Sequence, residues 1–401
     1  MAPFVEMEKG GLILTKWVRA IGFPLIGVAV FGFSSADAII LFRTADPTAN
    51  TTPPTNDAAG SGWNYEGVWG GFLGTPIAPH FFLSAAHIGQ AGSDFVYLGV
   101  TYTIAGNFND PFSDLDMWQV NETFPSFAPL YTRNDEVGQR VVAIGRGTQR
   151  GSAFMLNQQL RGWLWGGSDG VQRWGENIVF AIANFSSGPN DALYATFDQN
   201  GLTNECHFSS GDSGGAVFIS DAGVWKLAGI NYAVDGHFYT DSSGDGQFDA
   251  ALFDAGGLYY ADDANPGHYI QIDAGTPTGF YATRISSKLA WIESVIDPAG
   301  IANADGIPNL LEYAKTLNDV PPLGYGPASS QAAPSGGALI YKKLTDKPAL
   351  QYQVQESVDL VHWGPATSQD SVVATQGNVT TIKATVNGSS PLFLRLSATQ
   401  N

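Results

Sequence analysis

The sequence predicts an all-β protein, and three observations lead to this prediction. Only 14% of the 401 residues are charged, whereas 44% are apolar or aromatic. The chain also contains 48 glycines. Between residues 62 and 230, short apolar runs are separated by glycine, proline and asparagine, which is the spacing of an antiparallel barrel or sandwich. This composition is typical of a β-rich, loop-rich globular protein.

The first 38 residues have the pattern of an export signal. Lys9, Lys16 and Arg19 precede an apolar run from Ala20 to Phe33, and Ala36-Asp37-Ala38 is a small-x-small cleavage site. The apolar run is short for a membrane span. We therefore expect a cleaved signal peptide over 1–38 and a secreted or periplasmic protein without membrane attachment. An uncleaved anchor is the alternative.

Residues 39–61 indicate an N-terminal arm, because the stretch from Asp46 to Gly62 is rich in Thr, Pro, Asn and Gly and has no periodicity. The predicted strands that follow it are Val68–Leu73, Phe81–Ala86, Phe95–Val100, Arg140–Ile144, Ala153–Leu156, Ile178–Ile182, Ala192–Phe197, Gly215–Ile219 and Val224–Ile230.

Three stretches far apart in the chain carry the parts of a nucleophilic site. Ser213 lies between glycines in Gly211-Asp212-Ser213-Gly214-Gly215. A serine hydroxyl is a poor nucleophile, so it needs a base and donors for the oxyanion that its attack creates. His87 follows the apolar run Leu83–Ala86, and Asp114 heads another apolar run. Taken alone, each of these residues is more often structural.

With these residues in the order His, Asp, Ser, the chain resembles the chymotrypsin-like (trypsin fold) serine proteases. The resemblance also includes Gly74-Thr75-Pro76-Ile77 before the histidine strand and Leu227-Ala228-Gly229-Ile230 after the serine. Gly279-Phe280-Tyr281-Ala282-Thr283-Arg284-Ile285 is similar to the closing strand of that family. The similarity covers roughly residues 60 to 297. Within the family, the chain resembles the bacterial exported type.

The resemblance implies two six-stranded antiparallel Greek-key barrels with a C-terminal helix over 62–297, with the site in the cleft between them. It also implies that His87, Asp114 and Ser213 are catalytic and that the backbone N–H groups of Gly211 and Ser213 form an oxyanion hole. Asp116 is a second candidate for the carboxylate. Asp114 is favoured, because starting from Asp116 would place Gln119 where that family has an apolar residue.

The function expected from this resemblance is a serine endopeptidase that acts on proteins or peptides through an acyl-enzyme intermediate. One alternative is a catalytically silent relative that only binds, and another is an esterase, which would need the order Ser, acid, His. The net charge of −18 disfavours nucleic acid as a partner, because a strongly acidic surface repels phosphate backbones. We expect a monomer that requires no cofactor.

By alignment on the serine, the resemblance places His207, Tyr232 and Val234 in the primary substrate pocket. No acidic residue stands at the base of this pocket, so a preference for Lys or Arg is not expected. A valine on the wall narrows the pocket, which favours small or apolar residues before the scissile bond.

Residues 235–278 form an insertion that this family does not require. Within it, Asp241, Ser243, Asp245 and Asp249 have the alternating oxygen spacing of a calcium loop. Leu252 stands where such a loop has a bidentate acid. The residues are equally consistent with structural calcium or with an Asp- and Gly-rich turn.

Two further features bear on maturation and redox chemistry. A cut after Ala38 would leave Ile39 as the new N-terminus, and the resemblance implies that a freed isoleucine amine pairs with the aspartate before the serine, here Asp212. The glycines that normally follow that isoleucine are absent. Cys206 is the only cysteine, so no disulfide forms within the chain, and we expect a buried thiol.

The C-terminal third is expected to be a separate region. The spacing of apolar residues predicts a helix over Ser286–Val295. Residues 298–337 indicate a short helix and a linker, and 338–401 a small β-domain. Its predicted strands are Ala338–Lys343, Tyr352–Glu356, Ser371–Ala374, Val379–Ala384 and Leu392–Leu396.

Overall fold

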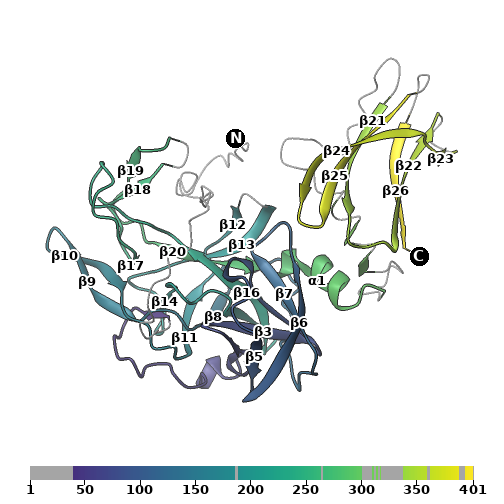
Figure 1. Cartoon of the computed structure of the whole chain (residues 1–401). Coiled ribbons are helices and arrows are strands. Elements are labelled where there is room, and N and C mark those ends of the chain that lie inside the picture. Colours follow the sequence, from purple (N-terminus) through teal and green to yellow (C-terminus); the bar gives the residue numbers. More distant parts are fainter. Residues whose placement is uncertain are drawn as a thin grey trace. The chain divides into compact units, whose positions relative to one another are not determined.

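The computed structural model describes residues 39–185, 188–262, 265–299, 309–310, 313–314, 317, 337–358, 362–387 and 393–400 (Figure 1). They belong to two compact units whose boundary lies between Ser287 and Lys288. The expected signal peptide over 1–38 and most of the expected linker lie outside the described residues. Among the described residues, no helix is both long enough and apolar enough to cross a membrane.

The first six strands after the N-terminal arm close into an antiparallel barrel, in the order β2-β3-β4-β7-β6-β5. This confirms the prediction of a six-stranded barrel in the first half of the unit. The strands are β2 (Gly67–Trp69), β3 (Phe72–Ala78), β4 (Phe81–Ala85), β5 (Asp94–Tyr97), β6 (Val100–Asn109) and β7 (Leu115–Val120).

Aromatic rings fill the interior of this barrel. Phe82 and Phe95 stack with ring centroids 4.0 Å apart, and the Trp69 ring lies 5.4 Å from Phe82. Two glycines on the barrel wall make room for them. A Cβ on Gly67 would lie 2.2 Å from the Phe95 ring, and one on Gly74 would lie 2.7 Å from Phe82. The barrel core therefore requires glycine at these two strand positions.

The second sheet has the order β11-β8-β15-β16-β20-β13-β12. Its inner strands β8 and β15 are short continuous apolar runs and are almost fully buried, as expected for strands covered on both faces. The strands are β8 (Arg140–Gly145), β11 (Arg173–Ile178), β12 (Ala181–Phe185), β13 (Gly188–Thr196), β15 (Ala216–Asp221), β16 (Val224–Val234) and β20 (Gly279–Arg284).

Seven strands are found here where six were expected, because one segment is divided in two. Only Val179 and Phe180 separate β11 from β12. Val179 N donates to Gln139 O beside β8, and Phe180 N donates to Tyr194 O on β13, at 3.0 and 2.8 Å. The two outer strands of the sheet are thus consecutive parts of the chain, and the sheet curves round so that its edges come together.

A hairpin and the insertion form a smaller sheet beside the second sheet. The hairpin consists of β9 (Arg150–Leu156) and β10 (Gln159–Trp165), and β10 pairs with β17 (Ala250–Leu252) of the insertion. Two more short strands of the insertion, β18 (Tyr259–Ala261) and β19 (Tyr269–Gln271), pair with each other. The segments share an apolar cluster that includes Phe238, Leu252, Leu258, Ile272, Phe154 and Leu156.

The N-terminal arm lies along the second sheet. Its strand β1 (Ile40–Leu41) pairs with β14 (Cys206–His207). Further along, Asn50 Nδ2 donates to Trp174 O at 2.8 Å, and Trp174 Nε1 donates to Thr52 O at 3.0 Å. Short 3-10 turns follow at η1 (Asn56–Ala58) and η2 (Trp63–Tyr65). Cys206 is fully buried, as expected, and burial raises the pKa of its thiol.

The second unit contains a short helix and two three-stranded sheets. The predicted helix is present as α1 (Leu289–Ile296); residues Ile285–Ser287 before it form the 3-10 turn η4 of the first unit. All five predicted C-terminal strands are present, together with a two-residue strand, β23. The sheets are β21 (Gly337–Leu344), β25 (Val379–Val386) and β24 (Ser368–Gln376), and β23 (Gly364–Pro365), β22 (Leu350–Ser357) and β26 (Phe393–Gln400).

Candidate active site

The pairing of two strands in the first barrel brings His87 next to Asp114. Ala85 of β4 lies opposite Leu115 of β7, and Ala86 N donates to Asp114 O at 3.1 Å. His87 follows in the 3-10 turn η3 (Ala86–Ile88), where the chain leaves the strand. The apolar strands therefore end at the same edge of the barrel, and each presents a polar side chain there.

A continuous chain of hydrogen bonds joins the three residues singled out from the sequence. His87 Nδ1 lies 2.6 Å from Asp114 Oδ2, and the His87 backbone N–H donates to Asp114 Oδ1 at 2.8 Å. His87 Nε2 lies 2.8 Å from Ser213 Oγ. Because a carboxylate accepts at Nδ1, that nitrogen carries the proton and Nε2 can accept from the serine hydroxyl. The Asp114 side chain is 11% exposed and that of His87 41%.

Burial raises the pKa of Asp114, and its hydrogen bonds and charge interaction with His87 oppose this rise. A carboxylate in this position is an electrostatic partner for an imidazolium. The arrangement thus supports a histidine that accepts a proton from Ser213.

Asp116, the alternative carboxylate, faces a different partner. Its two carboxylate oxygens accept from Asn107 Nδ2 at 3.2 and 3.0 Å. Burial raises the pKa of Asp116 to about 6. The two aspartates therefore have different partners: Asp114 bonds His87, and Asp116 bonds Asn107.

Glycines let the loop that carries Ser213 approach the first barrel closely. We call this loop, residues 208–215 between β14 and β15, the serine loop. Gly211 has a φ of +95°, in the left-handed region that favours glycine. A Cβ on Gly214 would lie 2.3 Å from Ser84 Oγ and 2.6 Å from Leu73 O, both in the first barrel. Any larger residue at Gly214 would push Ser213 away from His87.

Asp212 anchors the same loop from the inside. Its side chain is almost fully buried, and Oδ1 accepts from Gly147 N at 2.7 Å while Oδ2 accepts from Ser209 N at 2.8 Å. Asn231 Nδ2 donates to the Asp212 backbone carbonyl at 2.9 Å. Burial raises the pKa of Asp212 to about 6, although these hydrogen bonds favour its charged form.

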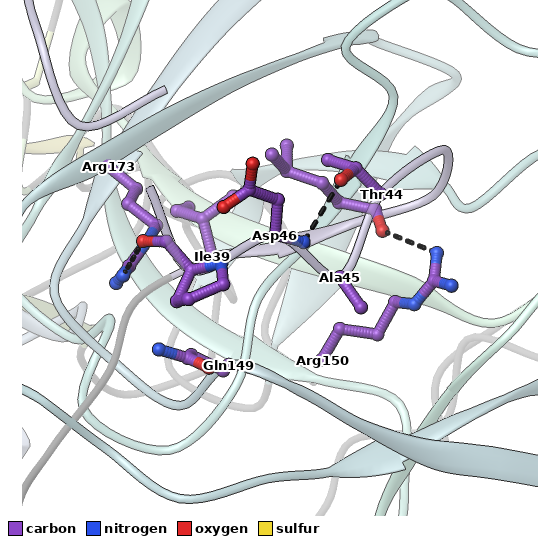
Figure 2. Close-up of a pocket in the computed structure, with 9 residues that line it drawn as sticks. Ile39, Thr44, Ala45, Asp46, Gln149, Arg150 and Arg173 are labelled. Carbon is purple, nitrogen blue, oxygen red and sulfur yellow. Dashed lines mark hydrogen bonds between the residues drawn. The ribbon is translucent and has the colours of Figure 1, made fainter. Parts of the chain in front are cut away.

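The start of the described chain reaches this carboxylate. Ile39 is buried, and its backbone nitrogen donates to Asp212 Oδ1 at 3.3 Å. The small pocket beside Ile39 is formed by the arm and by Gln149, Arg150 and Arg173, and Figure 2 shows the two arginines on opposite sides of it. Arg150 donates to Phe42 O at 2.5 Å, and Arg173 donates to Pro47 O. These contacts hold the arm so that Ile39 stays next to Asp212.

A cavity of about 250 Å³ opens beside Ser213. Tyr232 and Val234 line it, as the sequence led us to expect. His207 is not among the described residues that line it and is fully buried, with Nδ1 2.7 Å from Phe208 O. Burial lowers the pKa of His207 to about 4. The structure therefore places Phe208, the next residue, on the cavity lining where His207 was expected.

The calcium-like loop of the insertion is held by hydrogen bonds among its own residues. Asp241 Oδ1 accepts from Ser243 N at 2.8 Å, and Ser243 Oγ donates to Asp245 Oδ2 at 3.1 Å. Asp249 Oδ1 lies 2.5 Å from His237 Nδ1. In the part of the chain that the structure describes, no three His, Cys, Asp or Glu side chains are gathered so that they could hold a metal. Calcium binding stays a prediction, which melting with and without EGTA would test.

Several residues of this site were not found from the sequence. Phe208, Trp165, His237 and Asp249 all line the cavity beside Ser213. Asn231, which is buried, holds the serine loop. Asp249 was predicted only as a calcium ligand, and Trp165 and His237 lie in no recognisable motif. The pairing of β10 with the insertion brings these three residues to the cavity. Only Phe208 had a local signal, since it directly follows the position aligned with the pocket base.

No known family model matches the chain, and no curated protein is similar to it. Similar solved structures include neuropsin, a serine protease from mouse brain, at 14% identity, covering 59% of this chain and 96% of that chain with a TM-score of 0.37. Kallikrein-related peptidase 10 has 12% identity, with 59% and 98% covered and a TM-score of 0.35.

The passenger domain of plasmid encoded toxin, an autotransporter enterotoxin from enteroaggregative Escherichia coli, has 12% identity and a TM-score of 0.35. That match covers 57% of this chain but only 22% of the passenger domain. Likeness at this level assigns no activity to the chain.

The raised pKa of Asp116 gives a testable dependence of stability on pH. In the folded protein this pKa is about 6, against 3.8 for the ordinary group, so the folded state keeps the proton over that interval. The wild-type free energy of unfolding, minus that of Asp116→Asn, should therefore be greatest below pH 4 and decline as the pH rises to about 6. Urea unfolding of both proteins across this interval measures the difference. A difference that stays constant or grows with pH contradicts the assignment.

Proposed function

We propose that this protein is an exported serine endopeptidase that cleaves peptide bonds through an acyl-enzyme intermediate. The observation that carries the proposal is the continuous hydrogen-bond chain from Asp114 through His87 to Ser213. Nucleophile, base and orienting carboxylate stand in the geometry that activates a serine hydroxyl. The cavity beside Ser213 offers space for a substrate side chain.

In the proposed reaction, Ser213 Oγ attacks the carbonyl carbon of the scissile bond while its proton passes to His87 Nε2. Asp114 keeps the imidazole in the tautomer with Nδ1 protonated and stabilises the imidazolium that forms. His87 then gives the proton to the leaving amine, and an acyl ester remains on Ser213. A water molecule, deprotonated by His87, hydrolyses this ester and regenerates the serine.

The backbone N–H groups of Gly211 and Ser213 would stabilise the oxyanion of each tetrahedral intermediate. The positive φ of Gly211 and the anchoring of Asp212 by Gly147 and Ser209 support this role, because they fix the loop in advance. Donors that are already in place cost no reorganisation during the reaction.

A cut after Ala38 during maturation would place a new amine beside the Asp212 carboxylate in the serine loop. The donors to the Asp212 carboxylate are backbone N–H groups and the Ser209 hydroxyl, which are neutral. A freed Ile39 amine would supply a positive charge beside this buried carboxylate, since the Ile39 nitrogen lies 3.3 Å from it. Pairing favours the charged form of a buried acid and offsets its desolvation.

Labelling with a fluorophosphonate probe tests the nucleophile. We expect the probe to attach to the wild-type protein and to Ser168→Ala, but not to Ser213→Ala. Ser168 is the matched control because it also lies in a Gly-x-Ser-x-Gly sequence, whereas its Oγ bonds Gly147 O at 3.2 Å. Undiminished labelling of Ser213→Ala would show that the nucleophile lies elsewhere.

The two aspartates should differ sharply in their effect on catalysis. Asp114→Asn should lower kcat on a peptide substrate by about 10⁴-fold, because the amide favours the wrong tautomer of His87. Asp116→Asn should stay within about threefold of wild type, since its carboxylate bonds Asn107. Steady-state kinetics of both variants measure this contrast. Equal losses, or a larger loss in Asp116→Asn, would refute the choice of carboxylate.

The mature N-terminus should be Ile39. We expect N-terminal sequencing of protein collected outside the cytoplasm to begin Ile-Ile-Leu-Phe, because this start places the new amine at Asp212. Asp212→Asn, which removes the charge, should keep the same N-terminus but lose most of its activity. Any other start, in an active preparation, would exclude the proposed ion pair.

A further inference from the structure

Two segments outside the predicted catalytic motifs build one wall of the cavity beside Ser213. Trp165 comes from the end of β10, and His237 and Asp249 come from the insertion. Trp165 N donates to Asp249 O at 3.4 Å, and the Asp249 carboxylate lies 2.5 Å from His237 Nδ1. The three residues are thus linked to one another and form what we call the insertion wall.

The insertion wall is supported by packing behind it. β17 follows directly after Asp249 and pairs with β10, with Ala250 opposite Leu164. Trp165 packs on an apolar cluster that contains Trp163, Phe197 and Phe253. Trp165 is therefore part of a packed sheet, and Asp249 directly precedes the strand that pairs with β10.

The rest of the cavity is mainly apolar. Phe208 lines it and is held by the Phe280 ring, with centroids 3.9 Å apart. Tyr232, Ala233 and Val234 form another part of the lining. An apolar cavity of about 150 Å³ is enough to hold a benzene ring, and this one measures about 250 Å³. It has room for an aromatic or long aliphatic side chain.

Charged side chains fit this cavity poorly. The carboxylate of Asp212 is occupied by its backbone donors, and that of Asp249 by His237. A lysine ammonium in this cavity would lose its water against the mainly apolar lining around Phe208. A glutamate carboxylate would likewise lose its water against this lining. The lining therefore discriminates by size and polarity.

We propose that the insertion wall, Trp165 with His237 and Asp249, selects substrates with a large apolar residue on the acyl side of the scissile bond. This inference rests on the proposed function and assigns a specificity role to the hairpin and the insertion. The side chain would lie between this wall and Tyr232–Val234, with its tip against Phe208.

A panel of peptides that differ only in the residue before the scissile bond tests the proposal. We expect kcat/KM for Phe and Leu to exceed kcat/KM for Ala by about 10- to 100-fold. The excess over kcat/KM for Lys and Glu should be larger still. Trp165→Ala and His237→Ala should each reduce the advantage of Phe over Ala by about tenfold. His268→Ala is the matched control, because this exposed histidine belongs to the same insertion but not to the cavity.

The rate of fluorophosphonate labelling at Ser213 separates the possible failures. Without labelling of the wild-type protein, the proposed function and this inference both fall. If the wild-type protein is labelled but has its highest kcat/KM for Lys, Glu or Ala, this inference alone is wrong. It is also wrong if His237→Ala and His268→Ala have the same ratio of kcat/KM for Phe to kcat/KM for Ala. If Trp165→Ala loses labelling because it misfolds, the exposed His237 decides the outcome.

Discussion

The hydrogen bond between Ser213 Oγ and His87 Nε2 joins two sheets that fold from different halves of the unit, and the geometry of the site depends on it. His87 is placed by the register of β4 against β7, whereas Ser213 is placed by the loop between β14 and β15. The two sides meet at 2.8 Å only because Gly214 packs directly on Ser84 and Leu73. Chemistry at this site is thus a consequence of how the two sheets pack.

Asp212 connects the serine loop to the rest of the second sheet. Its carboxylate and carbonyl hold Gly147, Ser209, Ile39 and Asn231 around one buried point. Burying a carboxylate is costly unless it is hydrogen-bonded or paired. The arm that delivers Ile39 is therefore coupled to the shape of the serine loop, and changes at the N-terminus would be felt at the oxyanion donors.

Local motifs were sufficient to single out His87, Asp114 and Ser213, which the structure joins in one chain of hydrogen bonds. His87 and Asp114 lie directly beside strands, and Ser213 lies between glycines in the loop before β15. The resemblance predicted the six-stranded barrel, and the apolar runs predicted the five C-terminal strands. Two predicted runs in the barrel, Val68–Leu73 and Phe95–Val100, were wrong as single strands, because each covers the turn between two strands. The cavity was harder. His207 was expected at its base, but His207 is fully buried and the next residue, Phe208, lines the cavity. Trp165 meets Asp249 through the pairing of β10 with β17, and His237 meets Asp249 beside the bridge between Phe238 and Phe248. No local pattern encodes either pairing.

The proposed function depends on covalent acylation of Ser213. The most direct test is mass spectrometry of the protein quenched in acid during turnover of an activated ester such as a p-nitrophenyl ester. We predict an initial burst of about one p-nitrophenol per chain and an acyl group on the peptide that contains Ser213. Turnover without a burst, and with that peptide unmodified, would contradict it.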